Sequence, residues 1–461
     1  MNIIEQMRLF LEPRSVAIIG ATRRTGLGAQ NVFENMVKLR FRGKLYPVNP
    51  NAAEILGYPA YPSIKDIPHP VDLAVIATPR DTVIDLVRQC GEKGIRAVVV
   101  IAQGFADAGA EGRALQGELA QVARESGVRI IGPNTFGVAN AFLNLNTAFV
   151  LFKLVKRPVA VMSQTGFFFA GLPGYVLTGK GIDLGNSCDI DFADGLEYFE
   201  ADPLVKLIVL HIEGLQDGRR FMEVASRVAK KKPIIALKTA RTEQGTRMAQ
   251  SHTGSLGGED RVYDGVFRQC GIIRASDMDE LTDLVKGFVN LPLMKGPNLG
   301  VLAIPYGGAV ITADACHHYG LKLAELSPHT LADLSQFGPP WLKVINPVDF
   351  AFLAQYSGRD IVSVFRHMLS TILADRGVDG VLCILASQGK QDSLEFSDVI
   401  AEAAQGHSDK PIVGWFYGPR YSLIVGEMER SGKTVVYPSG ERAVRALARL
   451  RQCAQMTGGD E

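Results

Sequence analysis

Residues 15–28 read Ser-Val-Ala-Ile-Ile-Gly-Ala-Thr-Arg-Arg-Thr-Gly-Leu-Gly. The short apolar run that ends at Gly20 is typical of a buried parallel strand. A glycine-rich turn follows it, and the next residues predict a helix from about Ala29 to Leu39. A strand, a tight turn and a helix form the first unit of a doubly wound sheet, in which the helix N-terminus can hold a phosphate. The glycines at 20, 26 and 28 do not match the GxGxxG pattern.

The same alternation of strand and helix patterns continues along the chain. In the first region, strands are predicted at 44–48, 73–78, 97–101 and 128–132, with helices near 80–93 and 111–126. A segment rich in Asn and Phe, about residues 139–157, is expected to separate the first region from the second. The second region has predicted strands at 158–162, 207–212 and 233–239 and a helix near 218–230. After a linker-like segment at 291–297, the third has strands at 299–304, 378–386 and 411–417, a helix near 311–319 and a final helix at 441–454.

This pattern predicts an α/β protein with three Rossmann-like or flavodoxin-like domains, each built on a doubly wound parallel sheet. The expected domains are 1–140, 158–292 and 297–458. A chain of 461 residues has room for two to four domains of ordinary size.

Composition excludes several classes of protein. With 49 Lys plus Arg and 48 Asp plus Glu, the net charge is +1, so no general field favours nucleic acid or an anionic membrane. No apolar run reaches about 18 residues, the length that a membrane helix needs. The six cysteines are scattered without CxxC or metal-ligand spacing, and the N-terminus lacks a basic and then apolar signal segment. We therefore expect a reduced, cytoplasmic protein with no metal site and no membrane contact.

The second strand argues against a nicotinamide-dependent oxidoreductase. In such enzymes it usually ends in an acidic residue that binds the ribose, but here Asn49-Pro50-Asn51 follows it. The basic residues Arg42 and Lys44 suit a ligand that carries an extra phosphate. A solvated entrance to the strand explains them equally well.

Residues 250–258, Gln-Ser-His-Thr-Gly-Ser-Leu-Gly-Gly, contain a single histidine among small and hydroxyl side chains. This composition predicts an exposed, mobile loop. The neutral imidazole of His252 is a nucleophile, so on such a loop it could accept a phosphoryl group at one place and deliver it at another. The alternative is a surface loop whose histidine has no chemical role.

Two strand ends are expected to meet this loop, because the carboxyl ends of parallel strands share one edge of a sheet. Ser163-Gln164-Thr165-Gly166 lies between a strand and a helix predicted to begin near Phe167, where backbone amides could hold a phosphoryl group. N-capping by Ser or Thr is the alternative. Glu213 could orient the ring of His252, or could merely cap the next helix. His211 is interpreted as a packed sheet residue.

With these motifs, the chain resembles the α-type chains of NDP-forming acyl-CoA synthetases, which are relatives of the succinyl-CoA synthetase α subunit. The resemblance runs over nearly the whole length and is carried by these segments: 13–21 (Pro-Arg-Ser-Val-Ala-Ile-Ile-Gly-Ala), 43–50 (Gly-Lys-Leu-Tyr-Pro-Val-Asn-Pro), 132–134 (Gly-Pro-Asn), 185–186 (Gly-Asn), 189–191 (Asp-Ile-Asp), 213–214 (Glu-Gly), 251–256 (Ser-His-Thr-Gly-Ser-Leu) and 346–349 (Asn-Pro-Val-Asp). The pair formed by the histidine segment and Glu213 is the most specific part.

The resemblance implies a CoA-binding Rossmann-like domain, a flavodoxin-like domain with a phosphorylated histidine, and a third ligase-like α/β domain. His252 and Glu213 would be catalytic, and residues 163–166 (Ser163, Gln164, Thr165, Gly166) would bind phosphate. The residues expected to bind CoA, with its thiol near Asn134, are Thr22, Arg24, Gly28, Lys44, Asn49, Pro79 and Asn134. ATP or ADP with Mg²⁺ would bind an ATP-grasp β-type partner in a hetero-oligomer, and the substrates would be a small carboxylic acid, CoA and phosphate.

Two departures from the family pattern concern phenylalanine. The chain has Gly-Pro-Asn-Thr-Phe-Gly at 132–137 and Ser-Gln-Thr-Gly-Phe-Phe-Phe at 163–169, where relatives often carry smaller residues. On a helix, at most one or two of Phe167, Phe168 and Phe169 could face the site. Such a ring would either fill the space of a bulky acyl chain and restrict the enzyme to small acids, or offer a wall to a larger aryl or branched acid. We favour the second interpretation, and the alternative to both is that all three are core residues. A non-catalytic CoA-sensing module, or a divergent paralogue, is the alternative function.

Overall fold

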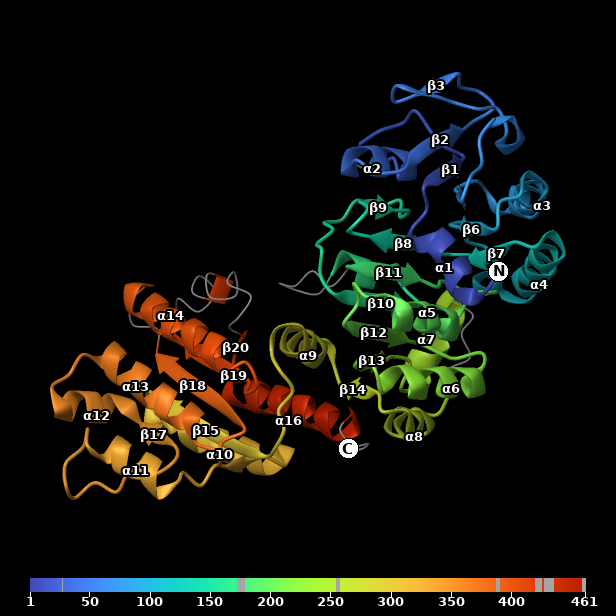
Figure 1. Ribbon diagram of the computed structural model, residues 1–461. Coiled ribbons are helices and arrows are strands. Elements are labelled where there is room, and N and C mark those ends of the chain that lie inside the picture. Colours follow the sequence, from blue (N-terminus) through green and yellow to red (C-terminus); the bar gives the residue numbers. More distant parts are fainter. Residues whose placement is uncertain are drawn as a thin grey trace. The chain divides into compact units, whose positions relative to one another are not determined.

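The computed structural model describes residues 1–26, 28–171, 179–253, 258–386, 390–418, 425–426 and 435–457. The chain divides into two compact units, Met1–Met278 (unit 1) and Asp279–Glu461 (unit 2). Among the described strands, unit 1 holds two large sheets and unit 2 holds a third (Figure 1). The predicted α/β class with parallel sheets is confirmed.

The first sheet has five parallel strands in the order β2-β1-β5-β6-β7. Their bounds are β1 Ser15–Ile19, β2 Lys44–Val48, β5 Leu73–Ile76, β6 Ala97–Val100 and β7 Arg129–Ile131. The helices that connect them are α2 Val32–Leu39, α3 Val83–Lys93 and α4 Gly109–Ser126. All residues of β1, β5 and β6 are buried, as expected of parallel strands covered on both faces. Strand order reverses between β1 and β5, and ligands bind at such a switch point in open α/β sheets.

Short elements complete this part of unit 1. They are the hairpin strands β3 Glu54–Ile55 and β4 Tyr58–Pro59 and the 3₁₀ helices η1 Ile64–Asp66, η2 Arg80–Thr82 and η3 Ala106–Ala108. The N-terminal helix α1, Ile3–Leu11, packs its buried face, which includes Met7 and Phe10, against α5 of the second sheet.

The second sheet has seven strands in the order β14-β13-β12-β10-β11-β8-β9. Their bounds are β8 Gly137–Asn140, β9 Leu145–Asn146, β10 Val159–Ser163, β11 Lys180–Asp183, β12 Leu207–Ile212, β13 Ile234–Lys238 and β14 Ile273–Ala275. The other elements are η4 Gly166–Ala170 and the helices α5 Phe192–Ala201, α6 Gly218–Ala229, α7 Glu243–Thr253 and α8 Asp260–Cys270.

The segment expected to separate the first two regions is therefore partly a component of the second sheet. Strand β8 pairs with β11 in the antiparallel sense, and β9 pairs with β8. The prediction of a plain break at 139–157 is wrong for these residues, because their pairing in the sheet depends on β11, which is distant in sequence.

Unit 2 contains a parallel sheet in the order β16-β15-β18-β19-β20, with β17 also paired to β15. The strands are β15 Asn298–Ala303, β16 Lys322–Leu323, β17 Val348–Asp349, β18 Gly380–Ala386, β19 Ile412–Tyr417 and β20 Val435–Tyr437. The helices are α9 Met278–Asn290, α10 Tyr306–Tyr319, α11 Pro328–Ser335, α12 Phe350–Ser357, α13 Ile361–Ala374, α14 Lys390–Gly406 and α16 Gly440–Thr457.

The two faces of this sheet belong to different hydrophobic clusters. Along β18, Val381 and Cys383 belong to one cluster with α13 and α14, whereas Leu382 and Ile384 belong to another with α10 and α16. This alternation follows from the two-residue period of a strand. Helices thus cover both faces, as the sequence predicts for a doubly wound sheet.

The division into three domains stays a prediction. The three large sheets follow the three predicted regions in order, but the expected boundary at residue 140 falls at the end of β8. One hydrophobic cluster also joins strands of the first sheet, such as β1 at Val16, to the helices of the second, such as α5 at Leu196. In the part of the chain that the structure describes, no helix is both long and apolar enough to cross a membrane.

Candidate functional site

Two cavities border the carboxyl ends of the strands in unit 1. The larger one, about 400 Å³, is lined by Gln30, Val32, Ala77, Thr78, Ile101, Ala102, Gln103 and Phe149. The smaller one, about 230 Å³, is lined by Ile101, Gln103, Asn134, Thr135, Phe136, Phe149, Gln164, Thr165, Gly166, Phe167 and Asp183. Ile101, Gln103 and Phe149 contribute to both cavities, so the two spaces adjoin one another.

The glycine-rich turn after β1 is held together by its own side chains. Gly20 has a φ of +89°, and a Cβ there would lie 2.7 Å from the carbonyl oxygen of Ala77, so only glycine fits this close approach. The Asn31 amide Nδ2 donates to the carbonyl oxygens of Thr22 (2.9 Å) and Arg24 (2.8 Å). The Asn31 Oδ1 also caps α2 by accepting from the backbone N–H of Glu34 (3.2 Å).

The predicted CoA-binding residues Thr22, Arg24 and Gly28 all lie on this turn, where Arg24 and Gly28 are exposed. Asn49 follows the neighbouring strand β2, and its Nδ2 donates to the carbonyl oxygen of Ala21 (2.8 Å). The structure therefore brings these four predicted residues to one edge of the first sheet.

The other predicted CoA residues of the first sheet lie elsewhere. Pro79 follows Thr78, which lines the larger cavity. Lys44 opens β2 and pairs with Ser15 in the register, so it lies at the amino ends of the strands. A strand rises about 3.3 Å per residue, which places Lys44 more than about 10 Å from the glycine-rich turn. Lys44 is thus not brought together with the turn residues.

Asn134 lines the smaller cavity from a tight turn that follows β7. It has a φ of +59° and comes directly after the cis peptide bond between Gly132 and Pro133. Its Nδ2 donates to the Oδ1 of Asn186 (3.2 Å), and the Asn186 backbone N–H donates to the carbonyl oxygen of Pro133 (2.9 Å). These bonds join the turn after β7 to the turn after β11.

The turn after β10 contributes the predicted phosphate-binding residues Gln164, Thr165 and Gly166 to the smaller cavity. Ser163 is buried, and its hydroxyl donates to the carbonyl oxygen of Thr165 (2.8 Å). Thr165 holds the N-cap position of η4 without a side-chain cap bond, so N-capping does not explain this pair of hydroxyls. The residues that follow, Gly166–Ala170, form a short 3₁₀ helix, and the prediction of an α-helix from Phe167 is wrong for them.

Gln164 connects this turn to the end of β12. Its side-chain Oε1 accepts from the backbone N–H groups of Glu213 (2.7 Å) and Gly214 (3.1 Å). The carbonyl oxygen of Glu213 in turn accepts from the buried ammonium of Lys238 (2.9 Å). Burial lowers the pKa of Lys238 to about 8. The Glu213 backbone is thereby held from two sides.

Glu213 does not cap the helix that follows it. The N-cap of α6 is Asp217, whose side chain accepts from the backbone N–H of Arg220 (2.9 Å). The capping interpretation of Glu213 is therefore wrong, and its side chain is 9% exposed at the end of β12.

The backbone of His252 belongs to the last turn of α7, Glu243–Thr253. The prediction of a loop is wrong for residues 250–253, because the helix runs further than the small residues suggested. An ion pair between Glu243 and Arg247 at the (i, i+4) spacing (2.5 Å) supports its first turns. The side chain of His252 and residues 254–257 lie outside the described part of the structure. A contact between His252 and Glu213 stays a prediction.

Of the three consecutive phenylalanines, Phe167 faces the smaller cavity and is 57% exposed. Phe168 stacks on the ring of His211 (4.5 Å between centroids), and Phe169 is fully buried. Of these three rings, only that of Phe167 lines the smaller cavity, which agrees with the expectation that one or two of them could do so. His211 is a packed sheet residue, as predicted, and burial lowers its pKa to about 3.

Phe136, the other departure from the family pattern, packs edge to face against Phe149 (4.8 Å between centroids) in the wall of the smaller cavity. A Cβ on Gly166 would lie 2.4 Å from the Phe136 ring, so glycine is required where this ring packs against the turn after β10. Three aromatic rings, those of Phe136, Phe149 and Phe167, therefore border this cavity beside its polar groups.

Asp183 is a cavity residue that the sequence analysis missed. It ends β11, is 2% exposed, and its Oδ2 accepts from the backbone N–H of Phe136 (2.7 Å). Burial raises the pKa of Asp183 to about 7. It was missed because residues 180–183 were not predicted as a strand. A carboxylate at a strand end, the signal that singled out Glu213, would have found it.

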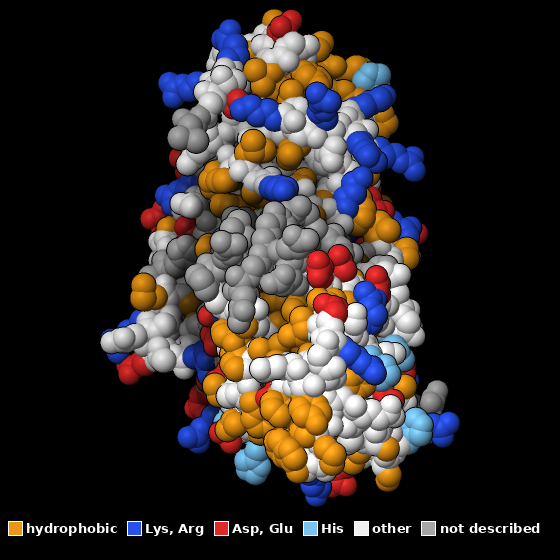
Figure 2. Space-filling view, turned by 90° about the vertical axis from the view of Figure 1, so that its left-hand side faces the viewer, with side chains coloured by type: hydrophobic (Ala, Val, Ile, Leu, Met, Phe, Trp, Pro, Cys, Tyr) orange, Lys and Arg blue, Asp and Glu red, His pale blue; other side chains and the backbone are white. Residues whose placement is uncertain are grey.

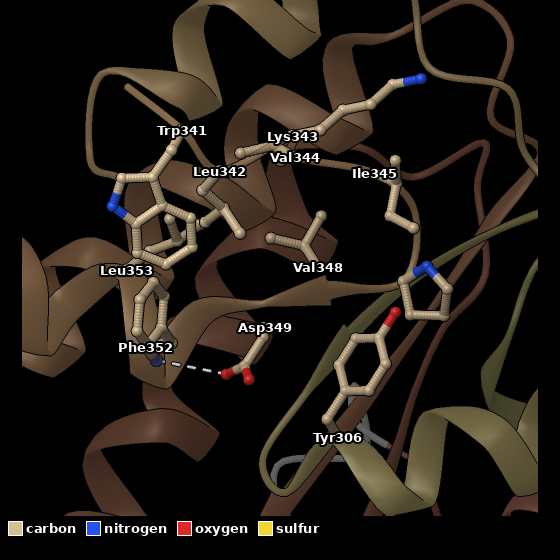
Figure 3. A pocket seen from close by; sticks show the side chains of 11 residues that line it. Tyr306, Trp341, Leu342, Lys343, Val344, Ile345, Val348, Asp349, Phe352 and Leu353 are labelled. Carbon is tan, nitrogen blue, oxygen red and sulfur yellow. Dashed lines mark hydrogen bonds between the residues drawn. The ribbon is translucent and has the colours of Figure 1, made fainter. Parts of the chain in front are cut away.

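Unit 2 contains a different groove of about 410 Å³ (Figure 3). It is lined by Tyr306, Trp341, Leu342, Lys343, Val344, Ile345, Pro347, Val348, Asp349, Phe352 and Leu353. The Asp349 Oδ1 accepts from the backbone N–H of Phe352 (3.2 Å) and caps α12. Hydrophobic side chains also gather on the surface in the lower part of Figure 2, at the height of α11 and α12 in Figure 1.

Comparisons with known proteins point to one family. Residues 14–141 match the CoA binding domain, and residues 156–288 match the succinyl-CoA ligase like flavodoxin domain. The α subunit of the ADP-forming acetate–CoA ligase II of Pyrococcus furiosus is 37% identical over 458 residues, which cover 98% of each chain. The ADP-forming acetate–CoA ligase I of Archaeoglobus fulgidus is 36% identical, and there the match covers 98% of this chain and 64% of the longer relative.

A solved structure agrees with these matches. It is the dinucleotide forming acetyl-coenzyme A synthetase 1 of Candidatus Korarchaeum cryptofilum in complex with phosphate and ADP. The TM-score is 0.88 at 32% identity, and the match covers 99% of this chain and 98% of that chain. The similarity therefore includes both units.

Proposed function

The chain belongs to the family of ADP-forming acetate–CoA ligase α subunits, and we propose that it works as the α-type subunit of an NDP-forming acyl-CoA synthetase. The reaction interconverts acyl-CoA, ADP and phosphate with carboxylic acid, CoA and ATP. Its pathway runs through an acyl phosphate and a phosphohistidine.

The pair of adjoining cavities in unit 1 is the observation that supports this proposal most. The larger cavity lies at the switch point between β1 and β5, beside the glycine-rich turn, and suits the CoA chain. The smaller cavity joins Asn134 to the turn formed by Gln164, Thr165 and Gly166, and suits the acyl and phosphoryl groups. Because Gln103 and Phe149 line both cavities, the two spaces adjoin, and the CoA thiol in the larger one could reach the acyl carbon in the smaller one.

The proposed chemistry has three steps. A ring nitrogen of His252 accepts the γ-phosphoryl group of ATP, and ADP leaves. A carboxylate oxygen of the substrate then attacks this phosphorus, so that the N–P bond breaks and an acyl phosphate forms. The CoA thiolate finally attacks the acyl carbon, and phosphate leaves with the electrons of the C–O bond.

We assign one role in this reaction to each group of residues in the site. The carboxylate of Glu213 accepts the second ring N–H of His252 and offsets the positive charge of the phosphorylated ring. Backbone N–H groups at the turn of Thr165 and Gly166 hold the phosphoryl oxygens. Thr22, Arg24, Gly28, Asn49 and Pro79 are the proposed CoA contacts that lie toward the carboxyl ends of the first sheet.

We further propose an ATP-grasp β-type partner that binds ATP or ADP with Mg²⁺, so that the active form is a hetero-oligomer. The longer Archaeoglobus relative supports this, because this chain spans 64% of it. The name of the Pyrococcus relative, an α subunit, supports it as well. The proposed cytoplasmic location rests on the six cysteines, which are scattered without CxxC or metal-ligand spacing.

The test combines the chain with its partner, γ-labelled ATP and Mg²⁺. We expect acid-labile, base-stable label on this chain, absent from His252→Ala, and acyl-CoA formation when acid and CoA are added. Label that persists in His252→Ala would contradict the assignment of the carrier. Acyl-CoA binding without label or turnover would favour a sensing module, and calorimetric binding of NADH with exclusion of CoA would favour an oxidoreductase.

A further inference from the structure

The smaller cavity of unit 1 has an unusual charge composition for a site that receives anions. Among the described residues that line it, Asp183 is the only ionisable side chain, and the polar remainder are neutral amides and hydroxyls. No Lys or Arg side chain of the described residues forms an ion pair with Asp183. The one ionisable group that the described lining contributes is thus an acid.

Asp183 is surrounded by uncharged groups on the adjacent strands and by backbone N–H donors. On the adjacent strands, its register partners are Ser163 of β10 and Gly137 of β8, which carry no charge. Backbone N–H groups reach both carboxyl oxygens, from Phe136 to Oδ2 (2.7 Å) and from Gly185 to Oδ1 (3.4 Å). Among the described residues, Asp183 therefore has hydrogen-bond donors but forms no ion pair with a Lys or Arg side chain.

Opposing effects decide its protonation state. Burial raises the pKa of Asp183 to about 7, and the charge of Glu213 acts in the same direction. The N–H groups of Phe136 and Gly185 and the hydroxyl of Thr135 stabilise the carboxylate, but burial outweighs them. A bound carboxylate or phosphoryl group brings a further negative charge into the same cavity. Because like charges raise a carboxyl pKa, the bound anion favours the protonated form of Asp183 still more.

A protonated carboxyl group is also a hydrogen-bond donor. Its hydroxyl in this cavity has a natural acceptor in the substrate, since both the acid and the acyl phosphate are rich in anionic oxygens. From this geometry, and resting on the proposed function, we propose that Asp183 binds the carboxylic acid substrate as a neutral acid, donating a hydrogen bond to an oxygen of the bound anion.

The consequence is a pH dependence with a defined sign. Below pH 7 the free site is already protonated, and affinity for the acid does not change. Above pH 7 the proton must be taken up on binding, so the affinity falls about tenfold per pH unit. An aliphatic or aryl carboxylate remains ionised throughout this range, so its own titration does not contribute.

The test compares wild type, Asp183→Asn and Asp183→Ala between pH 6 and 9, with the partner chain present and phenylacetate and acetate as substrates. The amide of Asp183→Asn keeps one acceptor and one donor but cannot ionise. We expect the ratio of kcat/KM between Asp183→Asn and wild type to rise about tenfold per pH unit above pH 7. Asp183→Ala should lose about tenfold to a hundredfold at pH 6.5, the loss typical of one hydrogen bond to a charged group.

A ratio that stays constant with pH would overturn the proposal, as would equal values for the Asn and Ala variants. Asp349→Asn in unit 2 serves as the matched control and should follow the wild-type profile. Thermal unfolding of each variant separates a folding defect from a binding defect. If the wild type shows no turnover, the proposed function fails first, and calorimetric titration of the chain with phenylacetate applies the same pH test to binding alone.

Discussion

The cavity that contains Asp183 and the groove of unit 2 each border the carboxyl ends of parallel strands in a large sheet. Each includes an aspartate as the last residue of a strand, Asp183 of β11 and Asp349 of β17. The groove of unit 2 is the larger of the two, about 410 Å³ against about 230 Å³. Volume alone would therefore favour the groove of unit 2, and position at a strand edge does not separate the two.

The side chains do distinguish them. In unit 1 the wall contains the polar groups of Asn134, Gln164 and Thr165, whereas in unit 2 it is mainly apolar and includes Trp341, which is 75% exposed. Asp349 is committed to capping α12, but Asp183 is buried inside its cavity. The comparison teaches that a doubly wound sheet supplies a hollow at its carboxyl edge, and that chemistry depends on which polar groups remain for a ligand.

The largest expected difference between the two regions concerns Glu213. In Glu213→Gln the amide cannot offset the imidazolium charge, so phosphorylation of the chain should fall tenfold to a hundredfold, equivalent to about 1.5–3 kcal/mol. Asp349→Asn, which also neutralises a strand-end carboxylate, should leave labelling within about twofold, since Asn still caps α12 and the residue lies in the groove of unit 2. Initial rates of label incorporation measure both. Equal losses in the two variants would remove the distinction between the regions.

The next effect concerns Gln164, which holds the backbone of Glu213. Gln164→Leu leaves two buried N–H groups without their acceptor, which should cost about 1–3 kcal/mol of unfolding free energy and about tenfold in kcat. Gln164→Glu restores the acceptor but adds a negative charge beside the phosphoryl site. We expect it to regain stability without regaining activity, as measured by urea unfolding and steady-state kinetics. Full activity in Gln164→Leu would show that the bond to Glu213 and Gly214 has no role in the reaction.

Phe167 and Trp341 test the aromatic walls. Phe167→Ala should lower kcat/KM for phenylacetate relative to acetate several-fold. A fully buried apolar contact contributes about 1–3 kcal/mol, but the Phe167 ring is 57% exposed, so only part of this energy is expected. Trp341→Ala, in the groove of unit 2, should leave the preference order unchanged. A substrate panel from acetate to phenylacetate gives the answer. An unchanged order in Phe167→Ala would exclude this ring from the acyl pocket.

The smallest effect on activity is expected for Asp349→Ala. It removes the side-chain cap of α12 and should lower the unfolding free energy by about 1 kcal/mol, with no change in kcat/KM. Differential scanning calorimetry measures the stability, and the synthetase assay measures the activity. A large loss of activity at unchanged stability would instead assign a chemical task to the groove of unit 2.

Much of the fold was predictable because buried parallel strands are continuous apolar runs. Strand β2 begins and ends where predicted, and β1, β18 and β19 differ from the prediction by a residue or two. The 3₁₀ helix after Ser163 and the helical end of α7 were not predictable from small and aromatic residues, whose local preferences are weak. Strand β11 was missed because four residues with one glycine and two charges do not form an apolar run.

The site shows the same division. Asn134, Gln164, Thr165 and Gly166 were predicted from turns after strands, and they do line one cavity. Lys44 was predicted to bind CoA because it lies close in sequence to Asn49, but the strand register places it at the amino ends of β1 and β2, away from the cavities. The contact between Glu213 and His252 stays a prediction.

The sequence by itself determined the class of fold, the positions of most strands along the chain and the motifs of the synthetase family. Apolar periodicity and turn residues act over short distances along the chain, so these features can be predicted without tertiary structure. Only the tertiary structure decided which strand ends are neighbours. The antiparallel pairing of β8 with β11 places Asp183 beside Phe136, although 47 residues separate them in the chain. Burial by these neighbours, rather than any local sequence signal, changes the proton affinity of Asp183.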